Sequence, residues 1–182
     1  MTENHIESDG KEKNTIKSFI YEWGIPIISA FIIAFLINKY LLFKVLIPSE
    51  SMVPTLNVGD RLFVTRVYNL DKLNRGDIVV FYSEELQDDL IKRLIGLPGD
   101  KVEIVDGVVS VNGETLEEDY IGAEDKFNGV YEVPEGKYFF LGDNRLISKD
   151  SRYWINPYID GEDIEGKAQI KVYPFNEIGK VE

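Results

Sequence analysis

The sequence has no cysteine and a single histidine in 182 residues. Without cysteine there is no disulfide, no thiol nucleophile and no thiolate ligand for a metal ion, so any part of the chain outside the cell depends on its own core for stability. His5 lies in the polar stretch MTENHIESDGKEKN, which we expect to be a disordered tail. A Ser-His-Asp triad and histidine ligation of a metal are therefore excluded elsewhere in the chain. We expect no metal ion and no cofactor.

Basic residues are also scarce relative to acidic ones. The chain has 20 Lys and Arg against 32 Asp and Glu, a formal net charge of -12. Nucleic acid binding needs clustered basic side chains to neutralise phosphates, so we exclude nucleic acid as a partner. A solvated acidic surface accounts for most of the carboxylates, and no Asp-Thr-Gly or Asp-Ser-Gly stretch supports aspartic protease chemistry.

One hydrophobic run is long enough to cross a membrane. It reads WGIPIISAFIIAFLINKYLLF, residues 23–43, and at about 1.5 Å per residue it matches the thickness of a bilayer core. No small-residue cleavage site follows it, so we expect a retained anchor, with a buried core helix as the alternative. Three lysines precede the run and two lie at its end, which favours a cytoplasmic N-terminus.

The chain then divides into three predicted segments. Residues 1–21 form a cytoplasmic tail, 22–43 a transmembrane helix and 44–182 an extracytoplasmic domain large enough for its own core. In that domain GDRLFV, GDIVVF and GDKVEI each place a Gly-Asp turn before an apolar run, and Asn112-Gly113 is typical of a two-residue hairpin. KYFFLGD and AQIKVYPF are further short strand-like runs. We predict a mainly β fold, with an antiparallel sheet domain after one transmembrane helix.

A lysine interrupts the strand-like stretch DLIKRLIGLPGD, residues 89–100. Alternation along a strand places Lys92 on the same face as Leu90 and Leu94. At an ordinary pKa of about 10.4 only about one lysine in a thousand is neutral at neutral pH, whereas burial among apolar side chains lowers the pKa and makes a general base. The alternative is a cation at the end of a strand that reaches solvent. Lys171, by contrast, has polar neighbours on its face, which indicates a solvated lysine.

The remaining candidate nucleophile is a hydroxyl. IPSESMVPTL, residues 47–56, places Ser49 and Ser51 between Pro48 and Pro54. Prolines fix φ and hold the segment extended or turned, which presents a hydroxyl in a defined direction, although the same segment would also serve as a stiff linker. Ser51 follows the hydrophobic run by eight residues, so it lies within about 29 Å of its end and near the bilayer surface.

Four motifs, in order after the hydrophobic run, carry a resemblance to a known family. They are PSESMVPTL, GDRLFV, IKRLIGLPGD and GDNRLISKDSRYW. The chain resembles the type I signal peptidases, membrane-anchored Ser/Lys proteases that remove signal peptides, and is most similar to their single-span Gram-positive form. The resemblance covers the hydrophobic run and essentially the whole external domain.

The resemblance implies a role for each matching residue. Ser51 is the nucleophile, and Lys92 is the general base that takes its proton and returns one to the leaving amine. The Ser51 backbone N–H and the Ser49 hydroxyl form the oxyanion hole, and the Ser148 hydroxyl orients Lys92. The residues expected to support the site are Arg145, Asp150 and Arg152.

Other positions near these motifs receive weaker interpretations. Arg93 belongs to the motif, and we expect it to pair with a carboxylate on the opposite face of the strand. A common form of the family has polar residues where Leu146 and Ile147 stand, so the geometry of this loop is expected to differ.

By resemblance, the substrates are secreted preproteins whose signal peptides have small residues before the cut, as in Ala-x-Ala. We expect an extended substrate to add as a strand beside the catalytic segment, where shallow pockets reject large side chains. We further expect contact with membrane lipid, a monomer, and a single-pass cell-membrane protein with its catalytic domain on the extracytoplasmic face. The expected pocket residues are Val45, Ile47, Met52, Leu56, Leu90 and Ile91.

Two other functions are open on the sequence alone. A membrane-tethered β domain without catalysis would serve as a binding or assembly module, but the joint presence of Ser51 and Lys92 argues against it. A Ser/Lys enzyme that cleaves itself is the other, and we expect no second folded domain for it to release.

Overall fold

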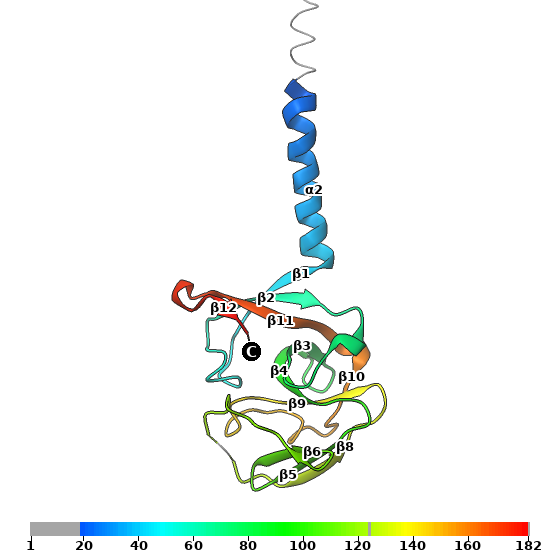
Figure 1. Cartoon of the computed structure of the whole chain (residues 1–182), viewed down its shortest axis with the longest axis vertical. Coiled ribbons are helices and arrows are strands. Elements are labelled where there is room, and N and C mark those ends of the chain that lie inside the picture. Colours follow the sequence, from blue (N-terminus) through cyan, green and yellow to red (C-terminus); the bar gives the residue numbers. More distant parts are fainter. Residues whose placement is uncertain (1–18, 124, 182) are drawn as a thin grey trace, which may run out of the picture. The chain divides into compact units, whose positions relative to one another are not determined.

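The computed structural model describes residues 19–123 and 125–181. His5 and most of the predicted tail lie outside these residues. The chain divides into two compact units, with the boundary between Leu41 and Leu42 (Figure 1).

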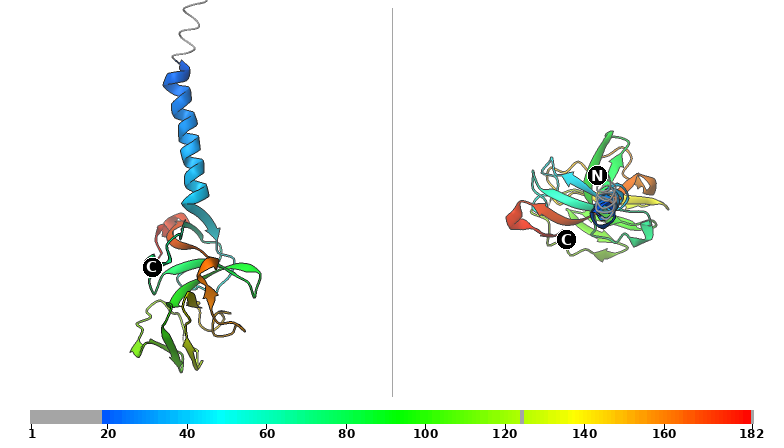
Figure 2. Two further views of the ribbon diagram at one scale, coloured as in Figure 1. Left: turned by 90° about the vertical axis from the view of Figure 1, so that its right-hand side faces the viewer. Right: turned by 90° about the horizontal axis from the view of Figure 1, so that it is seen from above.

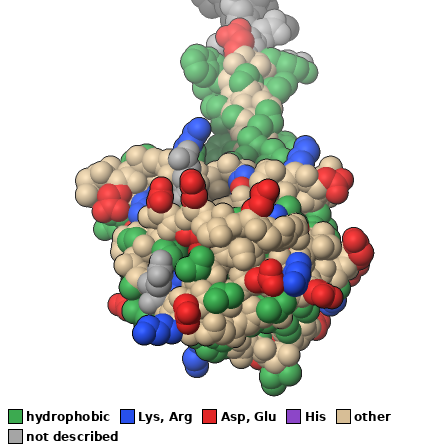
Figure 3. Space-filling view, turned by 60° about the horizontal axis from the view of Figure 1, so that its bottom comes forward, with side chains coloured by type: hydrophobic (Ala, Val, Ile, Leu, Met, Phe, Trp, Pro, Cys, Tyr) green, Lys and Arg blue, Asp and Glu red, His purple; other side chains and the backbone are tan. Residues whose placement is uncertain are grey.

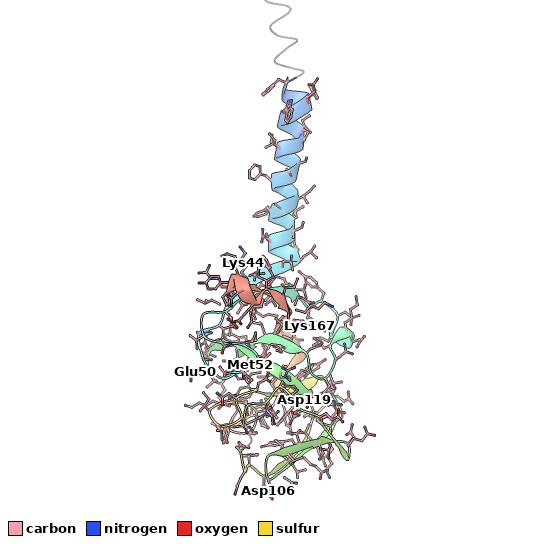
Figure 4. All side chains as sticks on the ribbon, turned by 60° about the vertical axis from the view of Figure 1, so that its left-hand side comes forward. Lys44, Glu50, Met52, Asp106, Asp119 and Lys167 are labelled. Atoms are coloured by element: carbon pink, nitrogen blue, oxygen red, sulfur yellow. The ribbon has the colours of Figure 1, made fainter. Side chains whose placement is uncertain are left out.

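The N-terminal unit is helical. A π-helical turn, η1 (Ile20–Gly24), leads into α2 (Ile25–Tyr40), whose first turn contains Pro26. The side chains of α2 project on all sides, and none is buried within this unit (Figure 4). By length and composition, residues 21–40 are sufficient to cross a membrane.

The helix ends earlier than the hydrophobic run predicts. The run continues to Phe43, but α2 stops at Tyr40. Leu42 and Phe43 instead begin the first strand, where they pair with Thr65 and Val64 of the second strand. Cross-strand hydrogen bonding thus takes these apolar residues into the folded domain.

The C-terminal unit is built from strands, with single 3-10 turns at η2 (Leu70–Lys72), η3 (Gly161–Asp163) and η4 (Phe175–Glu177). The strands are β1 (Leu42–Leu46), β2 (Arg61–Arg66), β3 (Ile78–Ser83), β4 (Asp88–Gly96), β5 (Lys101–Val105), β6 (Val108–Val111), β7 (Glu114–Thr115), β8 (Gly129–Glu132), β9 (Lys137–Leu141), β10 (Ile159–Asp160), β11 (Ile164–Tyr173) and β12 (Gly179–Lys180).

These strands form two antiparallel sheets. The larger has the order β1-β2-β11-β3-β4-β9-β10, with β12 beside β11, and the smaller has the order β7-β6-β5-β8. The views in Figures 1 and 2 place the smaller sheet at the end of the domain away from β1. The prediction of a mainly antiparallel β fold after one apolar helix is confirmed.

The three Gly-Asp turns share one local structure. Their glycines have φ values of 92°, 94° and 83°, a left-handed conformation that glycine adopts without steric cost. Each following aspartate accepts a hydrogen bond from the backbone N–H three residues before it, and the residue directly after each aspartate begins a strand. The aspartates are Asp60, Asp77 and Asp100.

The Asn112-Gly113 hairpin is also present. Both residues have positive φ, 54° and 86°, and Val111 pairs with Glu114 across the turn. Asp106-Gly107 makes a second hairpin of the same kind between β5 and β6, although we did not predict it from the sequence.

Strand β4 contributes to all three clusters of buried apolar side chains in the domain. Ile91 belongs to the cluster between β2, β3 and the segment after β1, and Leu94 to a second cluster around Phe81 and Phe140. Ile95 belongs to the third, under the smaller sheet. Because the flanking residues are fully packed, the middle of β4 is a dry environment for any polar side chain it carries.

Replacing Asp100 tests how much the aspartate of a Gly-Asp turn stabilises the domain. Its carboxylate accepts hydrogen bonds from Leu97 N–H at 2.7 Å, Asn112 Nδ2 at 2.7 Å and Arg75 at 3.0 Å. Replacing Asp100 with Ala leaves these donors unpaired, so we expect the free energy of unfolding to fall by about 1–3 kcal/mol in denaturant titrations at neutral pH.

The stability that Asp100→Ala removes is expected to depend on pH. Burial acts to raise the pKa of Asp100, but the hydrogen bonds from Leu97, Asn112 and Arg75 outweigh it and hold the pKa below its usual value. The stabilisation is therefore present above the unfolded-state pKa of about 3.9 and is lost as the pH falls through the folded-state value. Asp119→Asn, at an exposed position, is the control. Equal stability of the Asp100→Ala and wild-type proteins would show that these three hydrogen bonds do not stabilise the turn.

Candidate active site

Ser51 and Lys92 lie in direct contact. The Lys92 Nζ is 2.6 Å from Ser51 Oγ and 3.2 Å from the carbonyl oxygen of Ile91. Lys92 extends from β4, and Ser51 lies in the turn that follows β1. Tertiary folding thus joins a lysine and a serine that are 41 residues apart in the sequence.

Lys92 is held away from water. It is only 4% exposed, and its cross-strand neighbour Val79 is fully buried. Burial lowers the pKa of Lys92 from 10.5 to about 8, against the opposing influence of the Asp150 and Asp143 carboxylates. Close to half of the Lys92 side chains are then neutral near that pH, as a general base requires.

Hydrogen bonds attach the turn that carries Ser51 to the rest of the domain on both sides of that residue. Asn144 donates from its backbone N–H to the Ser51 carbonyl at 3.1 Å and from Nδ2 to the Glu50 carbonyl at 3.2 Å. Thr55 Oγ1 donates to Asp143 at 2.5 Å. Met52 is fully buried, whereas Glu50 points outward from the loop (Figure 4). The segment is part of the folded domain, so the stiff-linker interpretation is wrong.

Two hydrogen-bond donors face the space beside the Ser51 hydroxyl. Ser49 Oγ lies 3.3 Å from Ser51 Oγ and is exposed. The Ser51 backbone N–H makes no hydrogen bond to another residue in the described part of the chain. The Ser51 N–H and the exposed Ser49 hydroxyl are donors of the kind that an oxyanion hole uses.

Ser148 is buried close to Ser51. It is 2% exposed, and its backbone N–H donates to the Asn144 carbonyl at 2.9 Å. Its Oγ has no hydrogen-bond partner among residues 19–123 and 125–181, so a direct bond that orients Lys92 is not present in this structure. A buried hydroxyl without a partner is unusual in a folded protein.

Gly142 allows Ser51 and Ser148 to approach each other. A Cβ at this position would lie 2.5 Å from the Ser51 carbonyl oxygen and nearer still to Ser148 Oγ. The backbone N–H of Gly142 donates to Asp150 at 2.9 Å. Sequence reasoning missed Gly142, although a glycine directly after the strand KYFFL was a signal of close backbone approach.

Two buried aspartates near Lys92 are each paired with an arginine. Asp143 accepts from Arg93 Nε at 2.8 Å and Nη2 at 2.7 Å, which confirms the expectation that Arg93 pairs with a carboxylate. Asp150 accepts from Arg152 Nε at 2.8 Å and Nη2 at 2.9 Å. Both carboxylates are fully buried, so removing either arginine would leave an uncompensated charge, typically at a cost of about 3–5 kcal/mol.

The other residues of this loop have separate positions. Arg145 is buried and donates to the Gly142 carbonyl at 3.1 Å and to Glu118 at 2.5 and 3.0 Å. Leu146 and Ile147 are 60% and 54% exposed and line a surface hollow.

The expected pocket residues only partly come together. Leu90 packs against a different cluster from the other five, because it lies on the opposite face of β4 from Ile91. The remaining members share one cluster, namely Val45, Ile47, Met52, Leu56 and Ile91.

Lys171 is not the solvated lysine that the sequence indicated. Its side chain is 11% exposed, and its Nζ lies 2.7 Å from Asp60 and 3.1 Å from Glu177. Burial acts to lower the pKa of Lys171, but the hydrogen bonds to these two carboxylates raise it above its ordinary value. Carboxylate pairing thus keeps Lys171 charged, whereas Lys92 has a hydroxyl as its nearest partner.

Ionisable side chains elsewhere indicate a solvated surface. Figure 3 shows Asp and Glu interspersed with Lys and Arg over one face of the domain. Within the described ranges, no group of three or more histidine or acidic side chains is arranged to hold a metal ion.

Known proteins are similar to this chain in sequence over most of its length. The sequence profile described as signal peptidase, peptidase S26, matches residues 20–173. A signal peptidase I of Bacillus licheniformis is 40% identical over 185 residues, which cover 94% of this chain and 99% of the relative. A signal peptidase IB of Staphylococcus aureus strain COL is 38% identical and covers 89% of this chain and 94% of the relative. A solved signal peptidase I from Enterococcus faecalis V583 is 35% identical, with a TM-score of 0.46, and covers 54% of this chain and 98% of that chain.

Gly142→Ala tests the close approach of Ser51 and Ser148. The added Cβ has backbone on one side and a buried hydroxyl on the other, so we expect the free energy of unfolding to fall by about 1–3 kcal/mol in denaturant titrations. Gly179→Ala is the matched control, because nothing lies within 4 Å of a Cβ there and its φ is not positive. If the two variants are equally stable, the packing around Gly142 is looser than described.

The desolvation of Lys92 is directly measurable. NMR of the full chain in detergent, with 13C-labelled lysine, follows each lysine side chain, and the Lys92 signal is assigned by its absence in Lys92→Arg. We expect this signal to titrate near pH 8. The side chain is charged below this pH and neutral above it. Lys171 serves as the internal control, because, against the effect of burial, its ion pairs with Asp60 and Glu177 raise its pKa above that of an ordinary lysine. A Lys92 midpoint close to that of an exposed lysine would show that water reaches the amine.

Proposed function

The chain belongs to the signal peptidase family, peptidase S26, and is thus a peptidase that removes signal peptides from preproteins; we propose that Ser51 and Lys92 are its catalytic dyad. The observation that carries the proposal is a nearly fully buried amine 2.6 Å from a serine hydroxyl. The pKa of about 8 supports it, since an amine with an ordinary pKa is protonated at neutral pH and accepts no proton.

The chemistry follows from the positions of these groups. Neutral Lys92 accepts the Ser51 proton as Ser51 Oγ attacks the scissile carbonyl carbon. The Ser51 N–H and the Ser49 hydroxyl stabilise the negative charge that develops on the carbonyl oxygen. The Lys92 ammonium then donates its proton to the leaving amine. Water next attacks the acyl-enzyme while Lys92 takes one of its protons. The ester bond to Ser51 then breaks, the carboxyl product leaves, and the Lys92 ammonium returns the proton to Ser51 Oγ.

A vacant strand edge gives the substrate a place to bind. Strand β4 pairs with β3 from Asp88 to Arg93, but on its other side it pairs with β9 only from Arg93 onward. No described strand occupies that side before Arg93, beside Lys92. An extended signal peptide end can add there through backbone hydrogen bonds, as in other cases of strand addition.

The apolar cluster next to Ser51 supports a preference for small residues before the cut. Ile47 and Met52 are almost fully buried, and Ile91 is 7% exposed. Tightly packed walls leave little volume for a side chain at the scissile bond, which favours an Ala-x-Ala pattern by excluding larger residues. Val45 and Leu56 complete these walls in the proposal, whereas Leu90 does not.

We further propose that the apolar helix anchors the protein in the cell membrane. Residues 21–40 have a sufficient length, and the lysine bias favours a cytoplasmic N-terminus and a catalytic domain on the extracytoplasmic face. In this position Ser51 meets a preprotein as it emerges from the bilayer. A monomer suffices for the reaction, because Ser51 and Lys92 come from one chain.

Two substitutions test the dyad. In detergent, with a preprotein as substrate, we expect Ser51→Ala and Lys92→Ala each to lower kcat by more than about a hundredfold, because each removes an atom that takes part in bond making or proton transfer. Lys101→Ala is the matched control, since Lys101 is exposed and its Nζ forms an ion pair with Glu103. Cleavage should persist in EDTA, and the wild-type rate should rise with pH as Lys92 deprotonates. A Lys92→Ala protein that still cleaves at the wild-type rate would overturn the mechanism.

A further inference from the structure

Three buried arginines lie beside Lys92 in β4 and in the loop after β9; one segment of chain contacts two of them, and a residue just after that segment contacts the third. Arg93, Arg145 and Arg152 are 3%, 2% and 7% exposed. The segment is residues 116–123, which we name the strap; it leaves the smaller sheet after β7 and is followed by Asp125. The reaction proposed for Ser51 and Lys92 does not by itself require it.

Each arginine meets one residue from the strap or just after it. The guanidinium of Arg93 lies 3.7 Å from the centre of the Tyr120 ring. Arg145 donates to both oxygens of Glu118, at 3.0 and 2.5 Å. The hydroxyl of Tyr120 donates to Glu118 at 2.5 Å and so joins the first two contacts.

The third contact follows the strap. Arg152 forms an ion pair with Asp125, on the side away from Asp150. Farther back, a Cβ on Gly122 would lie 3.5 Å from Pro54, in the turn that carries Ser51. The strap therefore contacts Arg93 of β4 and Arg145 of the loop after β9, and Gly122 lies next to the turn that carries Ser51.

Through hydrogen bonds, the arginines link the strap to residues near Ser51. Arg93 holds Asp143, whose carboxylate accepts from Thr55 four residues after Ser51. Arg145 holds the carbonyl of Gly142, the residue that Ser51 and Ser148 both approach. Ser51 and Lys92 make no hydrogen bond with the described strap residues, so an effect of the strap on the reaction acts through the arginines.

We propose that Tyr120 and Glu118 are positioning residues for peptide cleavage, which hold Arg93 and Arg145 so that Ser51 stays in contact with Lys92. The inference rests on the proposed Ser51–Lys92 dyad. Tyr120 does so by stacking on Arg93, and Glu118 by a bidentate ion pair with Arg145. A guanidinium sandwiched between a carboxylate and an aromatic face has little freedom to rotate.

The same arrangement affects the charge of Lys92. The carboxylates of Asp143 and Asp150 favour the ammonium form of Lys92, and Arg93 and Arg152 are their respective partners. If Arg93 moves away from Asp143, that carboxylate stabilises the ammonium more strongly, and water reaches Lys92 more easily. Both changes raise the pKa of the amine, so the acidic limb of the rate profile moves to higher pH.

The experiment compares strap variants of the full chain in detergent with a preprotein substrate. We expect Tyr120→Leu to lower kcat by about tenfold with little change in KM, and to move the acidic limb of kcat/KM upward in pH. Tyr120→Phe keeps the ring over Arg93 and should recover most of the lost rate. Glu118→Gln keeps the shape but removes the charge partner of Arg145, and it should also lower kcat. Asp119→Asn is the matched control on the same strap, because Asp119 is exposed.

Thermal unfolding of each variant separates positioning from stability. Wild-type kcat and an unchanged pH profile in folded Tyr120→Leu and Glu118→Gln proteins would overturn the inference. A loss of rate equal to the unfolded fraction, with an unchanged pH profile, would do so as well. If Lys92→Ala abolishes cleavage while both strap variants keep it, the strap inference alone fails. If Lys92→Ala retains cleavage, the dyad fails and the strap inference fails with it.

Discussion

A lysine amine held out of water against a serine hydroxyl is the contact on which the rest of this structure depends. Lowering the Lys92 pKa from 10.5 to about 8 opposes folding by about 3 kcal/mol, a large part of the stability of a typical domain. The neighbours of Lys92 along β4 offset this cost, because Ile91, Leu94 and Ile95 each belong to a different buried cluster. The same packing that stabilises the fold therefore keeps the amine dry.

Desolvation alone does not determine the charge of Lys92, because two buried carboxylates oppose it. Asp143 and Asp150 both favour the ammonium form, and each is bound by an arginine through two hydrogen bonds. The arginines partly neutralise the two carboxylates, which also accept hydrogen bonds from the Gly142 backbone N–H and the Thr55 hydroxyl. In the proposed mechanism, the ion pairs and the Ser51–Lys92 pair thus pack together, and the strap contacts two of the arginines.

Much of the fold was predictable from local sequence chemistry. Glycines at positive φ and side-chain-capped turns are local requirements, so the Gly-Asp pairs and Asn112-Gly113 marked turns and strand starts correctly. The end of the helix was not predictable, because Leu42 and Phe43 are as suitable for lipid as for a strand, and pairing with β2 decides between them. For Lys171, register shifts in β11 on both sides of the residue disturb the alternation that the sequence predicts, and the carboxylates of Asp60 and Glu177 come from other parts of the chain.

The sequence by itself determined the residue types available for chemistry: a chain without cysteine, with its histidine in the tail, leaves hydroxyls, amines and carboxylates. It also determined the alternation that places Lys92 among leucines, since that depends only on strand geometry. Only the tertiary structure decided that Lys92 meets Ser51, that Ser148 Oγ stays unpaired within the described residues, and that Glu118 and Tyr120 reach the arginines. The reason is physical: desolvation and ion pairing depend on which distant segments pack together, and local propensity carries no information about those distances.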